Sequence, residues 1–313
     1  MSVWMTKVTY SLCSSHDDAL AAMSQAIPFI EGLGSDICSP FFSNEDVLHV
    51  IMAADGDILS VASTGATCRI HNTNGMPSSA CYNYDGSLYV TDYAHQGVLL
   101  VDLDNIKQNS NNNNQSTLVT TYEDKPLKGP SDIVVHNDTV YFTDSGPMGE
   151  TGLHSATGSI FSIVQSTVSG NNSPAASILR PITLNNLAYP SGIAVSNNGK
   201  YLYVAEMMTN RLLRYFQQPE GVFHGSVFHQ FSGGVGPSAV VTDKKGNIYV
   251  ALYDTKESST EGTVAVLSSQ GKLINEIITK GAEITGLAIN NNNVLYITEK
   301  SNGSIQKFNI ELI

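Results

Sequence analysis

Residues 130–135, with the sequence PSDIVV, and residues 140–144, with the sequence VYFTD, are two short apolar runs separated by a polar turn. β-branched and aromatic residues are frequent in both runs, which is typical of strands that pack on a buried surface. A third run, residues 158–164 (GSIFSIV), follows a long loop that contains several glycines. The three runs predict an antiparallel meander of the kind that builds one blade of a β-propeller.

The sequence that opens this meander occurs six times along the chain. Each copy begins with Gly, Pro or Ile, continues with a small hydroxyl residue, and leads into a short apolar run. The hydroxyl residues of the six copies are 43, 53, 60, 47 and 47 residues apart, which suits four-stranded blades with loops of variable length. We therefore predict an all-β, six-bladed propeller formed as a single domain by residues 1–313. The blades are expected to open near residues 34, 77, 130, 190, 237 and 284.

The first and last copies of the repeat are less regular than the others. The last copy supplies only three strands, and residues 26–31 (AIPFIE) are the expected fourth, so that an N-terminal strand closes the last blade and leaves no long open edge. Residues 1–24 are a lead-in with a candidate short helix at 15–23. In the first blade, residues 47–51 (VLHVI) fit either the second strand or the first, so this register stays open.

Composition excludes several classes of partner. The chain has 16 Lys and Arg against 28 Asp and Glu, a net charge of −12, which disfavours nucleic acid and anionic membrane surfaces as partners. No run of 18 apolar residues is present, and the N-terminus lacks a secretory pattern. We expect a soluble, cytoplasmic protein, with secretion after signal removal as the alternative. The four cysteines form no C-x-x-C pair, which favours reduced, buried thiols.

The repeated hydroxyl position predicts a ligand site. In a propeller the first strand of each blade lines the central channel, so these residues should form a ring at one mouth. The alternative is that small residues are needed where six strands converge. The loop at 146–154 could lean over this mouth and add Met148 and His154 to the ligand contacts. The predicted ring consists of Ser35, Ser78, Ser131, Ser191, Ser238 and Thr285.

Carboxylates form a second series, at the ends of second strands. One interpretation is structural, because an acid at a strand end can accept backbone N–H bonds from a neighbouring turn. The other is that several acids approach a common mouth and bind a cation or transfer protons. Asp36 and Asp132, each directly after a ring serine, are the better candidates for the mouth. The strand-end acids are Asp92, Asp144, Glu206 and Glu299.

Two phrases resemble a known family. Residues 130–135 with 141–146 (YFTDSG), and residues 190–194 (PSGIA) with 203–206 (YVAE), are similar to the gluconolactonase and regucalcin (senescence marker protein) family. Strictosidine synthase-like proteins share the architecture, and residues 204–206 with 210–215 (NRLLRY) resemble that branch. The resemblance implies a six-bladed propeller whose hydrolytic members hold a divalent metal, usually calcium, that polarises a lactone carbonyl.

The chain departs from the family at the metal ligands. The resemblance implies Glu, Asn, Asn and Asp at ring positions where this sequence has Ser35 or Asp36, Ser131, Ser191 and Ser238. Hydroxyls replace charged or amide ligands, so a calcium or other divalent site is expected to be altered or absent. Asp36 and Asp132 are the metal candidates that remain.

Three functions follow as hypotheses. The first is a lactone or ester hydrolase acting on a small molecule at the channel mouth, with an altered metal site or none. The second is a metal-independent enzyme of the strictosidine synthase-like type, in which an acid such as Asp132 or Glu299 transfers protons. The third is a non-catalytic binding propeller comparable to NHL-repeat proteins, with a protein partner.

Overall fold

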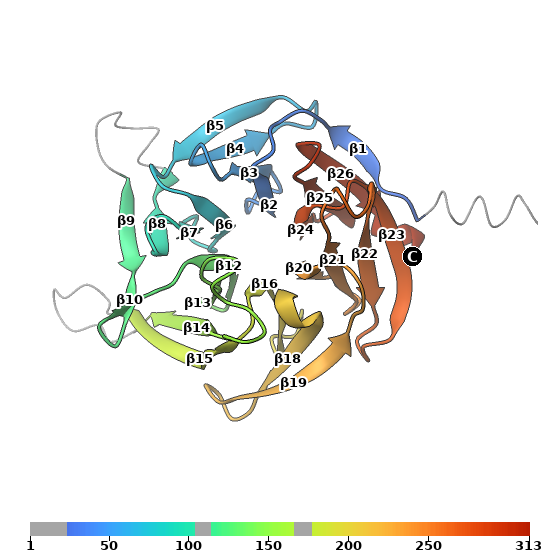
Figure 1. The fold of residues 1–313 in the computed structure, drawn as a ribbon. Helices are drawn as coiled ribbons and strands as arrows, with labels where there is room; N and C mark the ends of the chain where they lie inside the picture. Colours follow the sequence, from blue (N-terminus) through green and yellow to red (C-terminus); the bar gives the residue numbers. More distant parts are fainter. Residues whose placement is uncertain (1–23, 104–113, 166–176) are drawn as a thin grey trace, which may run out of the picture.

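The computed structural model describes residues 24–103, 114–165 and 177–313, and the candidate helix at 15–23 lies outside them. Six four-stranded antiparallel sheets surround a common axis, as Figure 1 shows. The prediction of an all-β, six-bladed propeller is confirmed. None of the helices in these ranges has the length and apolarity that a membrane span needs.

We number the blades by their first strands in chain order. Blade 1 consists of β2 (Ile37–Phe42), β3 (Leu48–Met52), β4 (Asp57–Val61) and β5 (Thr67–Asn72). Blade 2 consists of β6 (Pro77–Tyr82), β7 (Leu88–Asp92), β8 (Gly97–Val101) and β9 (Gln115–Val119). The hairpin of β10 (Thr121–Tyr122) and β11 (Lys125–Pro126) leads into blade 3, which consists of β12 (Pro130–His136), β13 (Thr139–Asp144), β14 (Gly158–Gln165) and β15 (Ser177–Leu187).

The second half of the ring repeats this order. Blade 4 consists of β16 (Pro190–Val195), β17 (Tyr201–Glu206), β18 (Arg211–Gln217) and β19 (Phe223–Gln230), with the 3₁₀ helix η1 (Met207–Thr209) after β17. Blade 5 consists of β20 (Gly236–Thr242), β21 (Ile248–Tyr253), β22 (Glu261–Leu267) and β23 (Leu273–Lys280). Blade 6 consists of β24 (Ile284–Ile289), β25 (Val294–Glu299), β26 (Ser304–Asn309) and β1 (Ile27–Ile30), and η2 (Ile310–Leu312) follows β26.

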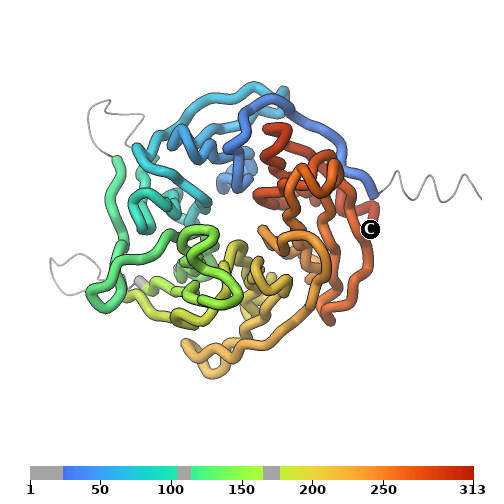
Figure 2. Tube along the Cα trace, in the orientation of Figure 1, coloured from blue at the N-terminus to red at the C-terminus, as the bar shows by residue number. Residues whose placement is uncertain are grey.

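The closing strand comes from the N-terminal side of the chain, as predicted. β1 pairs antiparallel with β26, with Ile27 opposite Lys307 and Ile30 opposite Ile305. Figure 2 shows this blue segment running beside the red strands of the last blade. Because both ends of the ring share one sheet, the edge of β26 is covered by backbone hydrogen bonds.

The strand pairing in the first blade resolves the two alternatives for residues 47–51. β2 precedes β3, so the run at 47–51 forms the second strand, and its assignment to the first strand is wrong. Residues 57–61 form the third strand, β4, because they pair with both β3 and β5.

The core lies between the blades. Each of six clusters of buried apolar residues joins two neighbouring blades, and together they run around the whole ring. Between blades 2 and 3, for example, Tyr89 and Val98 pack with Phe142 and Phe161. The alternating apolar side chains of each sheet thus pack face to face, which fixes the first strands around the axis.

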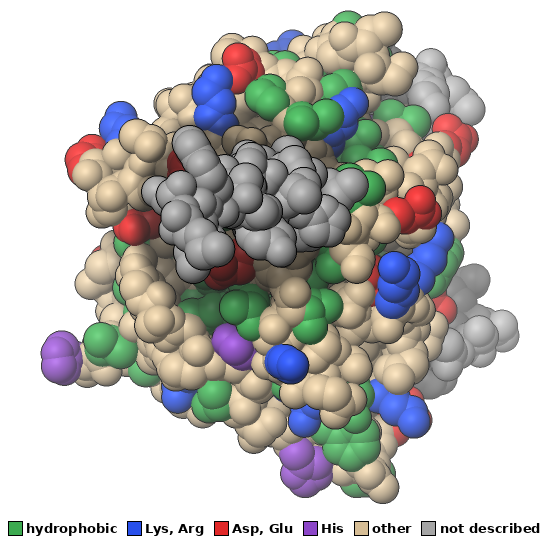
Figure 3. Space-filling model, turned by 90° about the vertical axis from the view of Figure 1, so that its right-hand side faces the viewer, with side chains coloured by type: hydrophobic (Ala, Val, Ile, Leu, Met, Phe, Trp, Pro, Cys, Tyr) green, Lys and Arg blue, Asp and Glu red, His purple; other side chains and the backbone are tan. Residues whose placement is uncertain are grey.

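One side of the molecule shows how charged residues are distributed there. On the visible part of the side shown in Figure 3, basic and acidic side chains are interspersed and do not gather into one patch of a single sign. The net charge of −12 therefore does not produce a single acidic patch on this visible part of the surface.

Candidate functional site

A cavity of about 420 Å³ lies at the mouth where the first strands begin. All six blades contribute to its lining, which combines tyrosine and methionine side chains with small hydroxyl residues. Such a mixture of apolar surface and a few polar groups is typical of small-molecule sites. Three rings of equivalent positions, one residue from each blade, build most of the cavity.

The first of these, the hydroxyl ring, follows the opening residue of each first strand. Ile37 pairs with Met52 as Pro77 pairs with Asp92 and Ile284 pairs with Glu299, so the residue after Ile37 belongs to the ring. That residue is Cys38. The ring members are Cys38, Ser78, Ser131, Ser191, Ser238 and Thr285, and all line the cavity.

Ser35 was predicted at this position, and that placement is wrong. Ser35 is exposed, precedes β2 and does not line the cavity. Residues 34–37 resemble the sequence that opens the other blades, but Ser35 lies three residues before Cys38, the actual ring residue. Whether the remaining ring residues bind a ligand stays a prediction.

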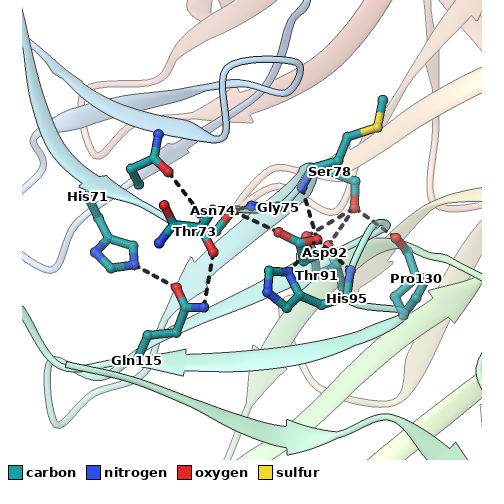
Figure 4. Close-up of polar contacts among 12 residues, drawn as sticks. His71, Thr73, Asn74, Gly75, Ser78, Thr91, Asp92, His95, Gln115 and Pro130 are labelled. Carbon is teal, nitrogen blue, oxygen red and sulfur yellow. Dashed lines mark hydrogen bonds and ion pairs between the residues drawn. The ribbon is translucent and has the colours of Figure 1, made fainter. Parts of the chain in front are cut away.

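The ring hydroxyls connect neighbouring blades. Ser78 donates to the Pro130 carbonyl at 2.8 Å, as Figure 4 shows. The other equivalent bonds join Ser191 to the Pro237 carbonyl at 2.9 Å, Ser238 to the Ile284 carbonyl at 2.7 Å, and Thr285 to the Ile37 carbonyl at 2.9 Å. A hydroxyl has one proton to donate, so these four are engaged with backbone. Within the described ranges the Ser131 hydroxyl makes no such bond and remains available to a ligand.

The second, inner ring is one residue further along each first strand. It consists of Ser39, Ser79, Asp132, Gly192, Ala239 and Gly286, and all but Gly192 line the cavity. A Cβ on Gly286 would lie 2.4 Å from the Pro40 Cδ atom of the next blade. Glycine is therefore required there by the close approach of blades 6 and 1.

Asp132 is the carboxylate of the inner ring, and donors from three successive blades hold it. Its Oδ1 atom accepts from the Ser79 hydroxyl at 2.6 Å and from the Ile133 N–H at 2.9 Å, while Oδ2 accepts from the Ile193 N–H at 2.8 Å. Burial raises the pKa of Asp132 above the ordinary carboxyl value, and these hydrogen bonds offset part of that rise. The carboxylate is half-buried and fixed in direction.

A third set, the rim ring, was missed by the sequence reasoning. It contains the residue after each strand-end position of the second strands, and its members are Ala53, Tyr93, Ser145, Met207, Tyr253 and Lys300. In four blades the rim residue directly follows a strand-end acid, so the regular spacing of these acids gives its position in the sequence. The residue type varies between blades and only tyrosine occurs twice, so no residue type that is common to the six copies marks the ring.

The strand-end acids themselves do not line the cavity. Each instead accepts the backbone N–H of the residue or residues just before its own first strand, from Met76 for Asp92 and from Lys128 and Gly129 for Asp144. Glu206 and Glu299 accept in the same way from Ala188 and Glu283. The structure therefore supports the structural interpretation of this series.

Asp92 shows how tightly such an acid is held. It is fully buried, and it accepts from the Thr73 hydroxyl at 2.8 Å and from the backbone N–H groups of Met76 and His95 at 3.0 Å (Figure 4). Burial alone would raise the pKa of Asp92, but these bonds together with the His95 ring hold it below its ordinary value. Its role is to fasten the loop that enters β6.

Glu299 was the second catalytic candidate. Its side chain is fully buried and accepts from the backbone N–H groups of Ser301 and Asn302, both at 2.9 Å, and from the Ser301 hydroxyl at 2.5 Å. It does not line the cavity. The structure thus places Glu299 beneath the rim, with its oxygen atoms occupied.

The loop after β13 contributes one of its two candidates. Met148 lines the cavity, although 55% of it is exposed to solvent. His154 is exposed and lies outside the cavity lining. The structure brings Met148 to the mouth and leaves His154 away from it.

The residues at the mouth do not fit a calcium ion. Calcium takes six to eight oxygen ligands, including several carboxylates. Asp132 is the only carboxylate among the lining residues of the described chain, and both of its oxygens already accept hydrogen bonds. Asp36 lies outside the lining and accepts the Ala54 N–H at 3.0 Å. Across residues 24–103, 114–165 and 177–313, no three His, Cys, Asp or Glu side chains form a candidate metal cluster.

The thiol in the hydroxyl ring is expected to be unreactive at neutral pH. Burial, with Asp36 and Asp132 nearby, raises the pKa of Cys38 to about 12. Since the thiolate is the reactive form, only about one molecule in ten thousand would carry it at pH 8. Treating the folded protein with a disulfide reagent and mapping the modified peptides should show rapid labelling of exposed Cys68 and none of Cys38. Equal labelling would contradict this placement.

Comparisons with known proteins agree with this architecture. Residues 41–301 match the sequence model of the SMP-30/gluconolactonase/LRE-like region. Lactonase drp35 of Staphylococcus haemolyticus is 32% identical over 115 residues, which is 36% of this chain and 33% of that protein. The match therefore spans only about a third of the relative.

Solved structures resemble the whole ring. A gluconolactonase from Xanthomonas campestris superposes with a TM-score of 0.69 at 17% identity, over 91% of this chain and 86% of that one. Regucalcin from Agrobacterium tumefaciens, described as a calcium-binding protein, also gives 0.69, at 18% identity over 90% and 92%. At these identities the likeness establishes the fold alone.

Proposed function

The chain belongs to the SMP-30/gluconolactonase/LRE-like family, and from this premise we propose that it hydrolyses a small lactone or ester in the mouth cavity, with Asp132 as general base. The observation that carries the proposal is the position of Asp132. It is the one carboxylate that the described chain presents to the cavity, and three blades hold it.

A chain of hydroxyls ends on this carboxylate. The Ser79 hydroxyl donates to Asp132, so in its 2.8 Å contact with Ser39 the proton must come from Ser39. A water molecule that donates to the Ser39 oxygen can therefore pass a proton along Ser39 and Ser79 to the Asp132 carboxylate. The water oxygen then attacks the carbonyl carbon, and the ester C–O bond breaks.

The same proton completes the reaction. Protonated Asp132 returns it to the leaving alkoxide by the reverse route, so that the products are a carboxylate and an alcohol and one proton is released. The phenols of Tyr253, in the rim ring, and of Tyr189, also in the cavity lining, serve as donors for the carbonyl oxygen on which negative charge develops. Burial raises the pKa of both Tyr189 and Tyr253, which keeps these phenols protonated. The proposal includes no metal-dependent step, because the donor set at the mouth does not fit calcium.

The test is hydrolysis of a panel of lactones and aryl esters by the purified protein, with and without added calcium. The proposal expects turnover that calcium does not increase. Binding without turnover of any member would instead favour the second candidate, a binding propeller. The observation that favours that candidate is the engagement of four ring hydroxyls with backbone carbonyls.

The rate should fall as the pH is lowered. Asp132 must be ionised to accept a proton, and its pKa is raised, so kcat/KM for a neutral lactone should decline through a midpoint above the ordinary carboxyl value of about 4. Ser79→Ala removes a hydrogen bond that lowers this pKa and also interrupts the proton route from Ser39, so the rate should fall at every pH and the midpoint should move to higher pH. A profile measured from pH 4 to 9 checks both shifts, and a midpoint that moves down would contradict the assignment.

A further inference from the structure

Lys300 is the only cationic residue that the described chain contributes to the cavity lining. It is the blade 6 member of the rim ring and directly follows β25. Its backbone is held in place, because its N–H donates to the Glu283 carbonyl at 2.9 Å and its carbonyl accepts from the Gly303 N–H at 3.1 Å. The base of the side chain is therefore fixed at the rim.

The ammonium group of Lys300 has no acidic partner within the described residues. The ion pairs found there join Arg69 to Asp57, His95 to Asp92, Arg211 to Glu206 and Lys280 to Glu31, and none involves Lys300. The charge also acts on the inside of the mouth, since it lowers the pKa of the Cys38 thiol while Asp36 and Asp132 raise it. A solvent-exposed cation without an ion-pair partner among the described residues thus contributes to the lining of a partly apolar cavity.

The arrangement of the blades separates the two charges. Lys300 comes from blade 6 and Asp132 from blade 3, which lie opposite each other across the six-bladed ring (Figure 1). Tyr93 and Tyr253, at equivalent rim positions of blades 2 and 5, lie on the two sides between them. The cavity therefore has a cationic end, an anionic end and aromatic side walls.

We infer that the cavity takes a substrate that carries a carboxylate, with this carboxylate bound by Lys300 and the reacting carbonyl directed to the relay of Ser39, Ser79 and Asp132. The charges permit one orientation, because the reverse would bring two carboxylates together. One ammonium group balances the single charge of a carboxylate but leaves a phosphate dianion with a net negative charge in the same cavity as Asp132. The choice of a reacting lactone or ester rests on the proposed function, whereas recognition of the carboxylate does not.

Binding of unreactive probes tests the cationic end directly. Benzoate and benzamide have the same shape and differ in charge. Calorimetric titration should show benzoate binding at least 10-fold more tightly than benzamide to the unmodified protein, as expected for a charge-assisted hydrogen bond. Lys300→Met should remove this preference and Lys300→Arg should keep most of it. Lys272→Met removes the same charge from an exposed turn outside the cavity and should leave the preference intact.

Turnover of a matched ester pair tests the orientation. For 3-acetoxybenzoate, Lys300→Met should raise KM by about 10-fold or more, and for its neutral methyl ester KM should stay within about twofold. If the unmodified protein binds benzoate and benzamide equally, or Lys272→Met has the same effect as Lys300→Met, the inference is overturned. If the benzoate preference depends on Lys300 but neither these two esters nor any lactone or aryl ester of the panel is hydrolysed, the proposed function fails and the carboxylate site stands.

Discussion

Replacing Asp132 by asparagine is expected to lower kcat for lactone or ester hydrolysis by about 10²- to 10⁴-fold, the range that a general base contributes. Asparagine keeps the volume of the side chain but cannot take up the proton that reaches it from Ser79. One of its two terminal atoms is an amide nitrogen, which would face a backbone N–H of Ile133 or Ile193 that now donates to a carboxylate oxygen. Some loss of stability is therefore expected together with the loss of rate.

Asp243→Asn separates these two effects. Asp243 is buried and, like Asp132, accepts three hydrogen bonds, from the Asn247 N–H at 2.8 Å, the Asn247 amide at 2.8 Å and the Tyr249 hydroxyl at 3.2 Å, but it does not line the cavity. This variant should lose stability to a similar degree and keep kcat. Steady-state kinetics at a temperature where both variants are folded make the comparison. Equal losses of kcat would show that Asp132 acts only through folding.

Glu299→Ala is expected to reduce the free energy of unfolding by about 3 to 5 kcal/mol, because it leaves buried donors without their charged acceptor. These donors are the N–H groups of Glu283, Ser301 and Asn302 and the side chains of Ser301 and Asn302. For a domain of this size the change corresponds to a fall in Tm of about 10 °C. Thermal unfolding followed by circular dichroism measures it.

Glu276→Ala is the matched control for this prediction. Glu276 lies on the outer strand β23 and is exposed, so its removal should change the free energy of unfolding by no more than about 0.5 kcal/mol. If Glu299→Ala melted together with this control and instead abolished turnover, Glu299 would belong to the reaction and the structural interpretation of the strand-end acids would fail.

Local sequence patterns could predict the blades but not every register. Most second strands carry the same alternation of apolar and polar residues as residues 140–144, and strand pairing follows from that pattern. In blade 1, residues 34–37 resemble the sequence that opens the other blades, but Ser35 does not lie at the ring position that the serines of those blades occupy. The observed register includes a non-local contact, because Thr285 of blade 6 donates to the carbonyl of Ile37. A scan along the chain does not detect such a contact.

The site was predictable at the positions that repeat. Ser131 and Asp132 fall in a recurring phrase, so their approach to the mouth follows from the fold. The rim ring could not be found in this way, because the residue type at that position changes from blade to blade, from Ala53 to Lys300, and only tyrosine occurs twice. A site that selects a particular ligand needs different side chains from different blades. The fold needs only the strand pattern that all six blades have in common.

The closing strand has a consequence for the order of events during synthesis. β1 is made early, but its partner β26 follows more than 270 residues later. At 5–20 residues per second, translation separates the two by roughly 15 to 55 s. During that interval the ribosome-bound chain carries an N-terminal strand with an unpaired edge, so a chaperone that shields strand edges would have its longest opportunity to act at residues 27–30. The ring can close only after the sixth blade has left the exit tunnel.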